Sequence, residues 1–501
     1  MKHLFVALPK AGKPVHLFDM NDKKFRQVLW GDWLTIDDSD DGQSTWVTVK
    51  WAWNNPYKAK ELKIERIYTT DSRPMEMVFV DVGQGDGCVL ITPERDIGER
   101  IIVIDAGKEH HMHDFLTGRF NSYKKKSVFH AAIITHPDED HYGGFDAIFA
   151  SNAVQFKYLY HSGLVERPGG KEWDKLGGKV DDVTGNASFV EALVEDHAGL
   201  QAAFAPAGAG NFAAMIKTGL ANGGITDSAM LSTRHGTLAE GRSWMPGFAP
   251  ADGRGYTIEI LGPFVEEDSN GKRRLRVLGS YGKTKNGHSV LLRLNYKNFR
   301  VLFGGDLNLP AEKYLLKRYA GLDRWPTTSA DRESMIEVAR NFFRAEVMKI
   351  CHHGAADVTD EFLMAVNPAA FVISSGDQEG HVHPRPDLLG RLGRAGRGAS
   401  PVLLSTELQR STREKEDARL VERLTKAIDG LTGAPTEGAK KKMLDDVKSL
   451  GRSNVDVDGA IYVKTDGERL IAAFKKEDKS DTDKWFYFEY EVVNGRLIMR
   501  A

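Results

Sequence analysis

The sequence of 501 residues contains only two cysteines, Cys88 and Cys351, and each lies beside an apolar run. Two isolated thiols argue against a disulfide-stapled secreted protein and predict small buried side chains. No apolar stretch approaches the ~20 residues of a membrane span. The short apolar run near the start is broken by Pro9 and Lys10, too early for the core of a signal peptide. We therefore expect a cytoplasmic protein with no membrane segment.

A charge excess of one sign is also missing. The 68 basic and 70 acidic residues leave a formal net charge of −2, so nothing global indicates a nucleic-acid or membrane-surface protein. A polyanion would have to bind at local basic clusters. Such clusters occur at 124–126, at 272–276, and at Arg391, Arg394 and Arg397.

Residues 1–72 contain short strand-like runs separated by turn-rich segments, with five tryptophans between Trp30 and Trp53. This pattern predicts a small all-β domain that resembles an SH3-like module. The tryptophans are expected to fill the core of so small a domain, or alternatively to line a groove for a protein partner.

A second domain is expected over residues 75–406, where short apolar strands end on glycine and polar loops. Buried strands that end on such loops are typical of α/β layered enzymes. Within it, the Gly- and Ala-rich interval 162–275 has no strong period and is expected to be an insertion or cap. Charged helices are predicted over 407–450, and 451–501 alternates like strands that complete or flank the sheets.

The densest group of ionisable residues is the segment 135–144, THPDEDHYGG, which holds His136, Asp138, Asp140 and His141. So many charges in one loop would repel each other unless cations neutralised them. Histidine with aspartate is the ligand set for zinc, manganese or iron. Two adjacent divalent ions are the natural solution.

Other strand ends offer further ligands. Asp105 ends the run IIVID, Asp306 ends VLFGGD, and His352 and His353 end EVMKICHH. Each follows an apolar run and precedes glycine or a polar turn. We expect these residues to complete the metal site begun by the 135–144 loop.

These segments resemble the metallo-β-lactamase superfamily, and more closely the hydrolase domain of the competence protein ComEC. The matching segments occur in family order between about Met77 and Leu392, and are FVDVGQGDG, VIDAG, THPDEDHYGG, NGHSVLLRLNY, RVLFGGDL, VMKICHHGA, NPAAFVISSG and HVHPRPDLLGRL. The resemblance implies an αββα sandwich with a two-metal site along one edge of the sheets. It leaves out the N-terminal domain and most of the 162–275 interval.

Carried over residue by residue, the resemblance implies these metal ligands: His136 and Asp138 for one ion, Asp140 and His141 for the other, Asp306 as the bridge, and one of His352 and His353 to complete the second ion. The superfamily pattern is HxHxDH, so Asp138 stands where many members have histidine. An oxygen ligand shifts the preference toward manganese without excluding zinc.

The third-motif histidine of the superfamily has two candidates. His161 ends the run VQFKYLYH, and His288 in NGHS is the weaker one. If neither binds, one ion keeps more open positions for water and substrate. Asp105, Asp86 and Gln84 match residues that support the ligand loops rather than bind the ions.

Further residues are implied in catalysis and substrate binding. Asp140 would orient the attacking water, and His383 would bind a phosphate oxygen or protonate the leaving group. His381, Asn286 and Ser289 are the implied substrate-binding residues.

Two divalent ions ~3.5–4 Å apart can activate a hydroxide and clamp the oxygens of a phosphodiester. No GxSxG motif, P-loop or serine or cysteine triad pattern competes with this chemistry. The leading hypothesis is a metal-dependent phosphodiesterase that acts on DNA, with zinc or manganese as cofactor. One alternative is a two-metal hydrolase of a small phosphoester, nucleotide or ester. The other is a binding or regulatory protein gated by a partner at residues 1–72.

Overall fold

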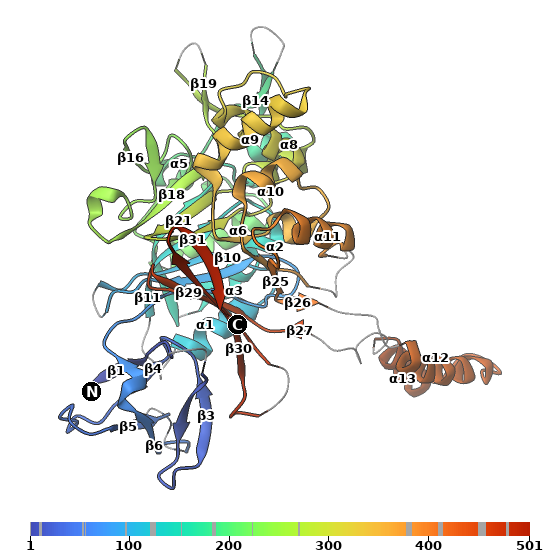
Figure 1. Ribbon diagram of the computed structural model, residues 1–501. Coiled ribbons are helices and arrows are strands. Elements are labelled where there is room, and N and C mark those ends of the chain that lie inside the picture. Colours follow the sequence, from blue (N-terminus) through green and yellow to red (C-terminus); the bar gives the residue numbers. More distant parts are fainter. Residues whose placement is uncertain are drawn as a thin grey trace.

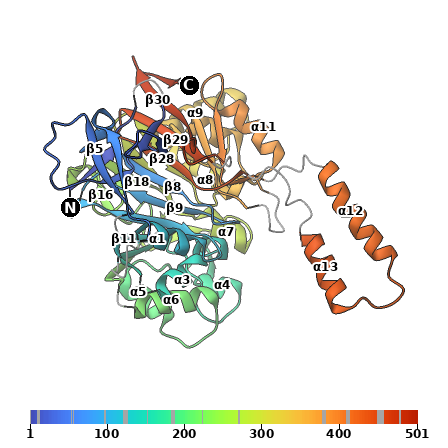
Figure 2. The same cartoon turned by 90° about the horizontal axis from the view of Figure 1, so that it is seen from below.

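Two large mixed β-sheets lie face to face at the centre of the protein, and helices cover both outer faces (Figures 1 and 2). The layers therefore run helix, sheet, sheet, helix, which confirms the predicted α/β class. The computed structural model describes residues 2–9, 13–52, 55, 57–95, 98–120, 127–151, 153–182, 187–222, 224–268, 271–376, 383–408, 414–448, 457–476 and 480–500.

The first sheet has ten strands. In order across the sheet they are β15 (Asp227–Met230), β12 (Val154–His161), β11 (Ser127–Ile134), β10 (Ile101–Ala106), β9 (Gly87–Ile91), β8 (Met75–Phe79), β28 (Ile461–Thr465), β29 (Arg469–Lys475), β30 (Trp485–Val493) and β31 (Arg496–Arg500). The four strands from β15 to β10 are parallel, and the others are antiparallel. The C-terminal strands join this sheet because β28 pairs with β8.

The second sheet has eight strands. In order they are β16 (Thr237–Ala239), β17 (Arg242–Trp244), β18 (Tyr256–Gly262), β21 (Leu291–Tyr296), β22 (Phe299–Phe303), β23 (Val347–Lys349), β24 (Ala370–Ile373) and β25 (Val402–Ser405). The strands from β22 to β25 are parallel. Consecutive parallel strands end at the same edge, which is where function is usually built in such sheets.

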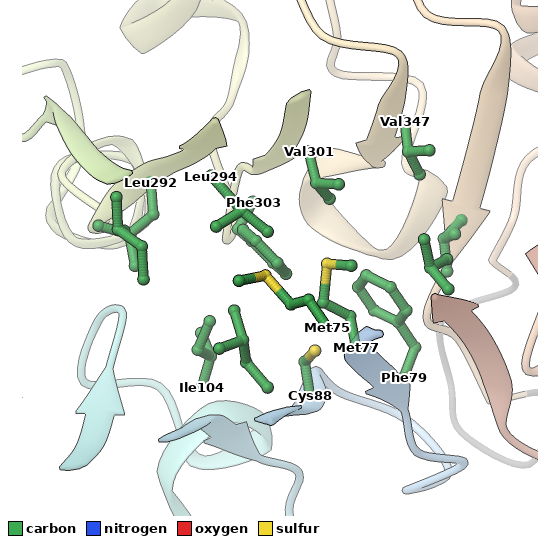
Figure 3. Packing of buried hydrophobic residues seen from close by; sticks show 14 of the residues in the cluster. Met75, Met77, Phe79, Cys88, Ile104, Leu292, Leu294, Val301, Phe303 and Val347 are labelled. Carbon is green, nitrogen blue, oxygen red and sulfur yellow. The ribbon is translucent and has the colours of Figure 1, made fainter. Parts of the chain in front are cut away.

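Apolar side chains of the two sheets meet in the layer between them (Figure 3). Met77 and Phe79 of β8 point into this layer, whereas Val78 faces the helices on the other side. Phe79 stacks on Phe303 of β22 with ring centroids 5.9 Å apart. Successive strand residues point to opposite faces, and both faces are covered here, so residues 77–80 are all apolar instead of alternating.

Amphipathic helices cover the two outer faces. The helices on the first sheet are α1 (His111–Phe120), α3 (Gly144–Ala150), α5 (His197–Phe204) and α6 (Asn211–Ala221). Those on the second sheet are α8 (Leu309–Tyr319), α9 (Ser329–Phe343), α10 (Asp360–Val366) and α11 (Pro386–Ala395). Two short helices adjoin candidate ligands: α2 (Glu139–Tyr142) contains Asp140 and His141, and α7 (Tyr281–Gly287) ends just before His288.

The N-terminal residues form a small β domain of two sheets. Its strands are β4 (Trp33–Thr35), β1 (His3–Val6) and β7 (Thr69–Thr70) in one sheet, and β3 (Lys24–Val28), β2 (Val15–Phe18), β6 (Lys60–Glu65) and β5 (Trp46–Trp51) in the other. The expectation that tryptophans fill its core is wrong, because that core is aliphatic. Trp33 is 54% exposed, and Trp30 packs against Ile471 of β29. Trp53 lies outside the described residues.

The interval 162–275 is not a separate cap. It contributes β15 to the first sheet and β16 to β18 to the second. The remainder holds α4 (Glu172–Leu176) and a small sheet of β13 (Lys179–Asp181), β14 (Ser188–Val190), β20 (Arg273–Arg276) and β19 (Glu266–Glu267). These strands are so short that their pattern is invisible locally, and pairing with distant partners stabilises them.

The predicted charged helices are α12 (Glu414–Asp429) and α13 (Glu437–Lys448). In both views they lie side by side and project away from the sheets (Figures 1 and 2). A two-stranded ribbon of β26 (Glu407–Leu408) and β27 (Val457–Asp458) joins the chain before and after them. Within the described ranges, no helix combines the length and apolar composition needed to cross a bilayer.

Glu312 is a buried carboxyl that ties α8 to α10. It accepts hydrogen bonds from the backbone N (2.5 Å) and Oγ1 (2.7 Å) of Thr359, which caps α10. Burial raises the pKa of Glu312 from 4.5 to about 8, although the bonds from Thr359 oppose this. The folded state therefore holds a proton that the unfolded state releases, so this contribution to stability is complete below about pH 4.5 and is lost as pH rises through about 8.

We expect Glu312→Gln, which stays neutral, to raise the thermal midpoint at pH 9 relative to the unchanged protein and to have little effect at pH 5. The expected gain is roughly 1–3 kcal/mol at the higher pH. Thermal unfolding followed by circular dichroism at both pH values measures it. Exposed Glu333→Gln is the control, and equal effects of Glu312→Gln at pH 5 and 9 would contradict the prediction.

Candidate metal centre

The candidate ligands follow the carboxyl ends of strands from both sheets. His136 follows β11, Asp306 follows β22, and His352 and His353 follow β23. β10 and β11 are parallel neighbours in the first sheet, as are β22 and β23 in the second. The loops after them therefore meet at one edge of the two packed sheets.

Asp306 is the common neighbour of four histidines. Its carboxylate oxygens lie 3.2 Å from His141 Nε2 and 3.3 Å from His353 Nε2. The Nε2 atoms of His352 and His136 are 3.8 Å and 4.0 Å away. The Asp306 side chain is only 3% exposed. A buried carboxylate surrounded by imidazole nitrogens is the arrangement expected of a shared metal ligand.

Acceptors orient the two most central imidazoles. His141 Nδ1 donates to Asp105 Oδ2 at 2.7 Å. His353 Nδ1 lies 3.1 Å from both the Ser374 carbonyl oxygen and Asp86 Oδ1. A proton on Nδ1 leaves Nε2 with its lone pair toward Asp306, which is how carboxylate and carbonyl groups prepare histidine for a metal.

Attraction between the histidines and the aspartates of the centre determines the direction of their pKa shifts. Burial lowers the pKa of His141, but the charges of Asp306 and Asp105 outweigh it and raise that pKa well above its usual range. Burial also lowers the pKa of His353, but the charges of Asp306 and Asp86 outweigh it and raise that pKa well above its usual range. Burial raises the pKa of Asp306, yet the charges of His353 and His141 hold it well below normal. A divalent cation would replace the imidazole protons as the neutralising charge.

Asp140, in the first turn of α2, lies on the open side of the centre. Its Oδ2 is 3.4 Å from His353 Nε2, and its Oδ1 is 4.0 Å from His141 Nε2. Burial raises the pKa of Asp140, but the hydrogen bond with His353 and the charge of His141 lower it overall. The side chains of Asp138, Asp140 and His352 are 27%, 26% and 29% exposed. They form the face that a substrate can reach.

We call His141, His353 and Asp140 the first arm of the centre, and His136 and Asp138 the second arm; Asp306 lies between them. His136 Nδ1 lies 3.1 Å from Thr135 Oγ1 and 3.3 Å from Ser289 Oγ, and its Nε2 is 3.6 Å from Asp138 Oδ2. Asp138 Oδ1 forms an ion pair with Lys285 Nζ. Burial raises the pKa of Asp138, but the contacts with His136 and Lys285 lower it to about 2.

The donor set fits a divalent cation. The side chains whose ligand atoms all lie within 4.8 Å of one another are Asp86, His141, Asp306 and His353. Asp86 acts behind His353 rather than on an ion, because its oxygens contact Lys349 and His353 Nδ1. Within the described ranges, His136 Nε2 and Asp306 Oδ1 are buried without a hydrogen-bond partner. Buried polar atoms rarely stay unpaired, and a metal ion would satisfy both.

Backbone strain also concentrates here. Asp105, His352 and His353 have φ values of 54°, 51° and 52°, in the left-handed region that residues with a Cβ avoid. Such conformations persist only where the surrounding structure enforces them, and they cluster at functional sites.

Neither third-motif candidate joins the group around Asp306. His161 is buried at the end of β12, its Nδ1 accepts from Gly163 N at 3.1 Å, and burial lowers its pKa to about 3. Its Nε2 has no hydrogen-bond partner in the described part of the chain, so it stays available to a ligand. His288 Nε2 instead donates to the Arg276 carbonyl at 2.7 Å, which commits it to a structural role.

Ser289 is misassigned as a substrate-binding residue. It is 1% exposed, and its Oγ accepts from Asp306 N at 3.0 Å. A buried hydroxyl beneath Asp306 positions that ligand and cannot touch substrate. The Asn286 amide, turned so that both its atoms are satisfied, donates to Asp138 Oδ2 at 2.9 Å.

The remaining predicted residues lie outside the group of side chains around Asp306 or outside the described residues. The His383 ring is 6.1 Å from that of His352, centroid to centroid, and His383 is half-buried. Gln84 Oε1 is buried without a hydrogen-bond partner among the described residues. His381 and the basic cluster 124–126 lie outside the described residues.

Two lysines of the centre were missed by sequence reasoning. Lys349 pairs with Asp86 and donates to the Gly305 carbonyl at 3.2 Å. A lysine within the apolar run EVMKIC was a usable signal, since a buried ammonium needs an anionic partner. Lys285 on α7 had no such signal, because its partner Asp138 is distant in sequence.

No protein-family model and no curated protein sequence matches the chain. One solved structure with a similar arrangement is a point mutant of CmlA β-hydroxylase, at 11% sequence identity and a TM-score of 0.29. The match covers 79% of this chain and 75% of that one. A likeness this distant carries no chemistry across, so the site is interpreted from its own residues.

Proposed function

We propose that this chain is a divalent-metal-dependent hydrolase of phosphoesters. The observation that carries the proposal is the convergence of imidazole Nε2 atoms on the buried Asp306, with the Nδ1 atoms of His141 and His353 held from behind. Bound divalent ions supply a water made acidic enough to attack at neutral pH and positive charge for the phosphoryl oxygens.

The residues of the chain divide the remaining work. His141, His353 and Asp306 hold the ion in the buried part of the centre. Asp140, on the exposed face, contributes to the same ion site and orients the attacking water. His383, beside His352, donates a proton to the leaving oxygen.

Membership of the metallo-β-lactamase superfamily, in the branch that resembles ComEC, is part of this proposal. It is supported by the segments quoted above and by the helix, sheet, sheet, helix layering. Asp138 in place of histidine adds an oxygen donor, so we propose manganese as the better cofactor and zinc as the alternative.

The basic segments favour a small phosphoester over DNA. Each basic side chain of the described clusters lies beside a carboxylate, although Arg391 and Arg394 share one. The pairs are Lys272 with Glu191, Arg273 with Glu195, Arg274 with Asp268, Arg276 with Glu266, Arg391 and Arg394 with Asp360, and Arg397 with Glu346. Phosphates would have to compete with these partners. A groove for a polyanion needs uncompensated positive charge.

The test is hydrolysis by protein stripped with a chelator and reloaded with manganese or zinc. Bis(p-nitrophenyl) phosphate, a dinucleotide, single-stranded DNA and duplex DNA are the substrates. We expect metal-dependent cleavage of the small diesters, reduced roughly 10²-fold or more by Asp140→Asn. Exposed Glu139→Gln, one residue away, should retain the rate.

Cleavage of DNA far faster than the small diesters would overturn the substrate choice and support a nuclease. Absence of hydrolysis with every metal and substrate would count against the enzyme itself. Equal losses in Asp140→Asn and Glu139→Gln would remove Asp140 from the reaction.

A further inference from the structure

The two arms of the centre carry different net charge. In the arm of His141 and His353, Asp140 and Asp306 supply two negative charges, while Asp86 is already matched by Lys349 and the imidazoles are neutral once an ion displaces their protons. That balance suits one divalent cation.

In the other arm, both oxygens of Asp138 already have donors. Oδ1 faces the Lys285 ammonium, and Oδ2 accepts at 2.9 Å from the Asn286 amide in the orientation that gives both its atoms partners. The protein itself therefore compensates part of the Asp138 charge before any ion binds, because the Lys285 ammonium is shared between Asp138 and Glu166.

Lys285 is held firmly in this position. Its side chain is 11% exposed, and Nζ lies 2.7 Å from Glu166 Oε1 and 3.5 Å from the Pro137 carbonyl oxygen. Nζ also lies 5.0 Å from the centre of the Tyr281 ring, whose hydroxyl donates to Glu166 at 2.9 Å. Moving the ammonium away would break its ion pairs with Glu166 and Asp138, which are only 22% and 27% exposed.

We propose that Lys285 makes the centre asymmetric, so that one divalent ion binds tightly between His141, His353, Asp140 and Asp306, while the fixed ammonium weakens a second ion at His136 and Asp138. This inference rests on the proposed metal-dependent function. A divalent ion on Asp138 would lie a few ångströms from Nζ, where repulsion between like charges in a buried site is large. The chain is then a one-metal protein at low metal concentration and a two-metal protein only at high concentration.

The opposite role is physically distinct. If Lys285 only fixed the rotamer of Asp138 for an ion, its removal would weaken the second site. The sign of the change in second-ion affinity therefore separates the two roles, independently of catalytic rate.

The experiment is titration of metal-free full-length protein with manganese, followed by calorimetry and native mass spectrometry. We expect one tight ion and one weaker ion for the unchanged protein. Lys285→Met and Lys285→Gln should strengthen the second ion about tenfold or more and leave the first unchanged. Glu166→Gln, which leaves the ammonium less compensated, should weaken the second ion further.

Lys283→Met is the matched control, because Lys283 is an exposed residue of the same helix α7. Thermal unfolding of each metal-free variant checks that it is folded. Two ions of equal affinity in the unchanged protein, or a second ion weakened by both Lys285 variants, would overturn the inference while leaving the hydrolase proposal intact. No ion bound at any concentration would instead overturn the hydrolase proposal.

Discussion

Asp306→Asn is expected to abolish tight metal binding and to lower metal-dependent hydrolysis of bis(p-nitrophenyl) phosphate roughly 10³-fold. The carboxylate is the common neighbour of four imidazoles and carries the charge that a divalent ion would balance. Asparagine keeps the shape but removes the charge, and its NH₂ group replaces one acceptor oxygen with a donor. Metal content after desalting, measured by inductively coupled plasma mass spectrometry, reports the loss directly.

Loss of the ligand must be separated from loss of the fold. The exposed Asp323→Asn is the control for a neutralised aspartate elsewhere. The circular dichroism spectrum of metal-free Asp306→Asn should match that of the unchanged protein, since its main interactions are within the centre. Retention of the full metal content in Asp306→Asn would remove it from the ligand set.

Deletion of residues 457–501 is expected to leave no soluble folded protein. β28 pairs with β8 along its whole length, and Ile461, Val463 and Leu470 belong to the core between the sheets. Without them β8 becomes an exposed apolar edge, which favours aggregation.

The deletion also removes the surface against which the N-terminal domain packs. Lys464 Nζ donates to the Trp30 carbonyl at 2.7 Å, and Trp30 packs against Ile471. Deletion of 496–501 alone, which removes the mostly exposed edge strand β31, should leave the fold intact. Soluble expression and size-exclusion chromatography of both truncations measure the effect. A soluble, metal-binding protein without 457–501 would show that β28 to β31 are dispensable.

The kind of chemistry was accessible from the sequence because ligand residues at strand ends leave a local pattern. His136 and Asp138 share one loop, while Asp306 and His353 each follow an apolar strand, and the structure brings all four together. Two packed sheets with parallel strands leave these loops at one edge. Burial of the strands and exposure of their ends are both properties of short segments.

The substrate inference was less secure, because charge runs do not reveal their partners. The cluster 272–276 looks like a basic patch in sequence, yet Glu191, Glu195, Asp268 and Glu266 neutralise it. Glu266 and Asp268 lie in the same hairpin, but Glu191 and Glu195 are distant in sequence and meet the cluster only in the folded protein. Local charge density therefore overstated the positive potential.

The sequence by itself determined the α/β class and the strand ends that carry histidine and aspartate, because each depends on a few consecutive residues. Only the tertiary structure decided that β28 pairs with β8, that Asp105 and Asp86 orient His141 and His353, and that Lys285 compensates Asp138. The physical reason is the separation in sequence between the residues that interact. Strand formation and turns follow from local burial and backbone preferences, whereas the partner of a buried charge is set by which distant segments the core brings together.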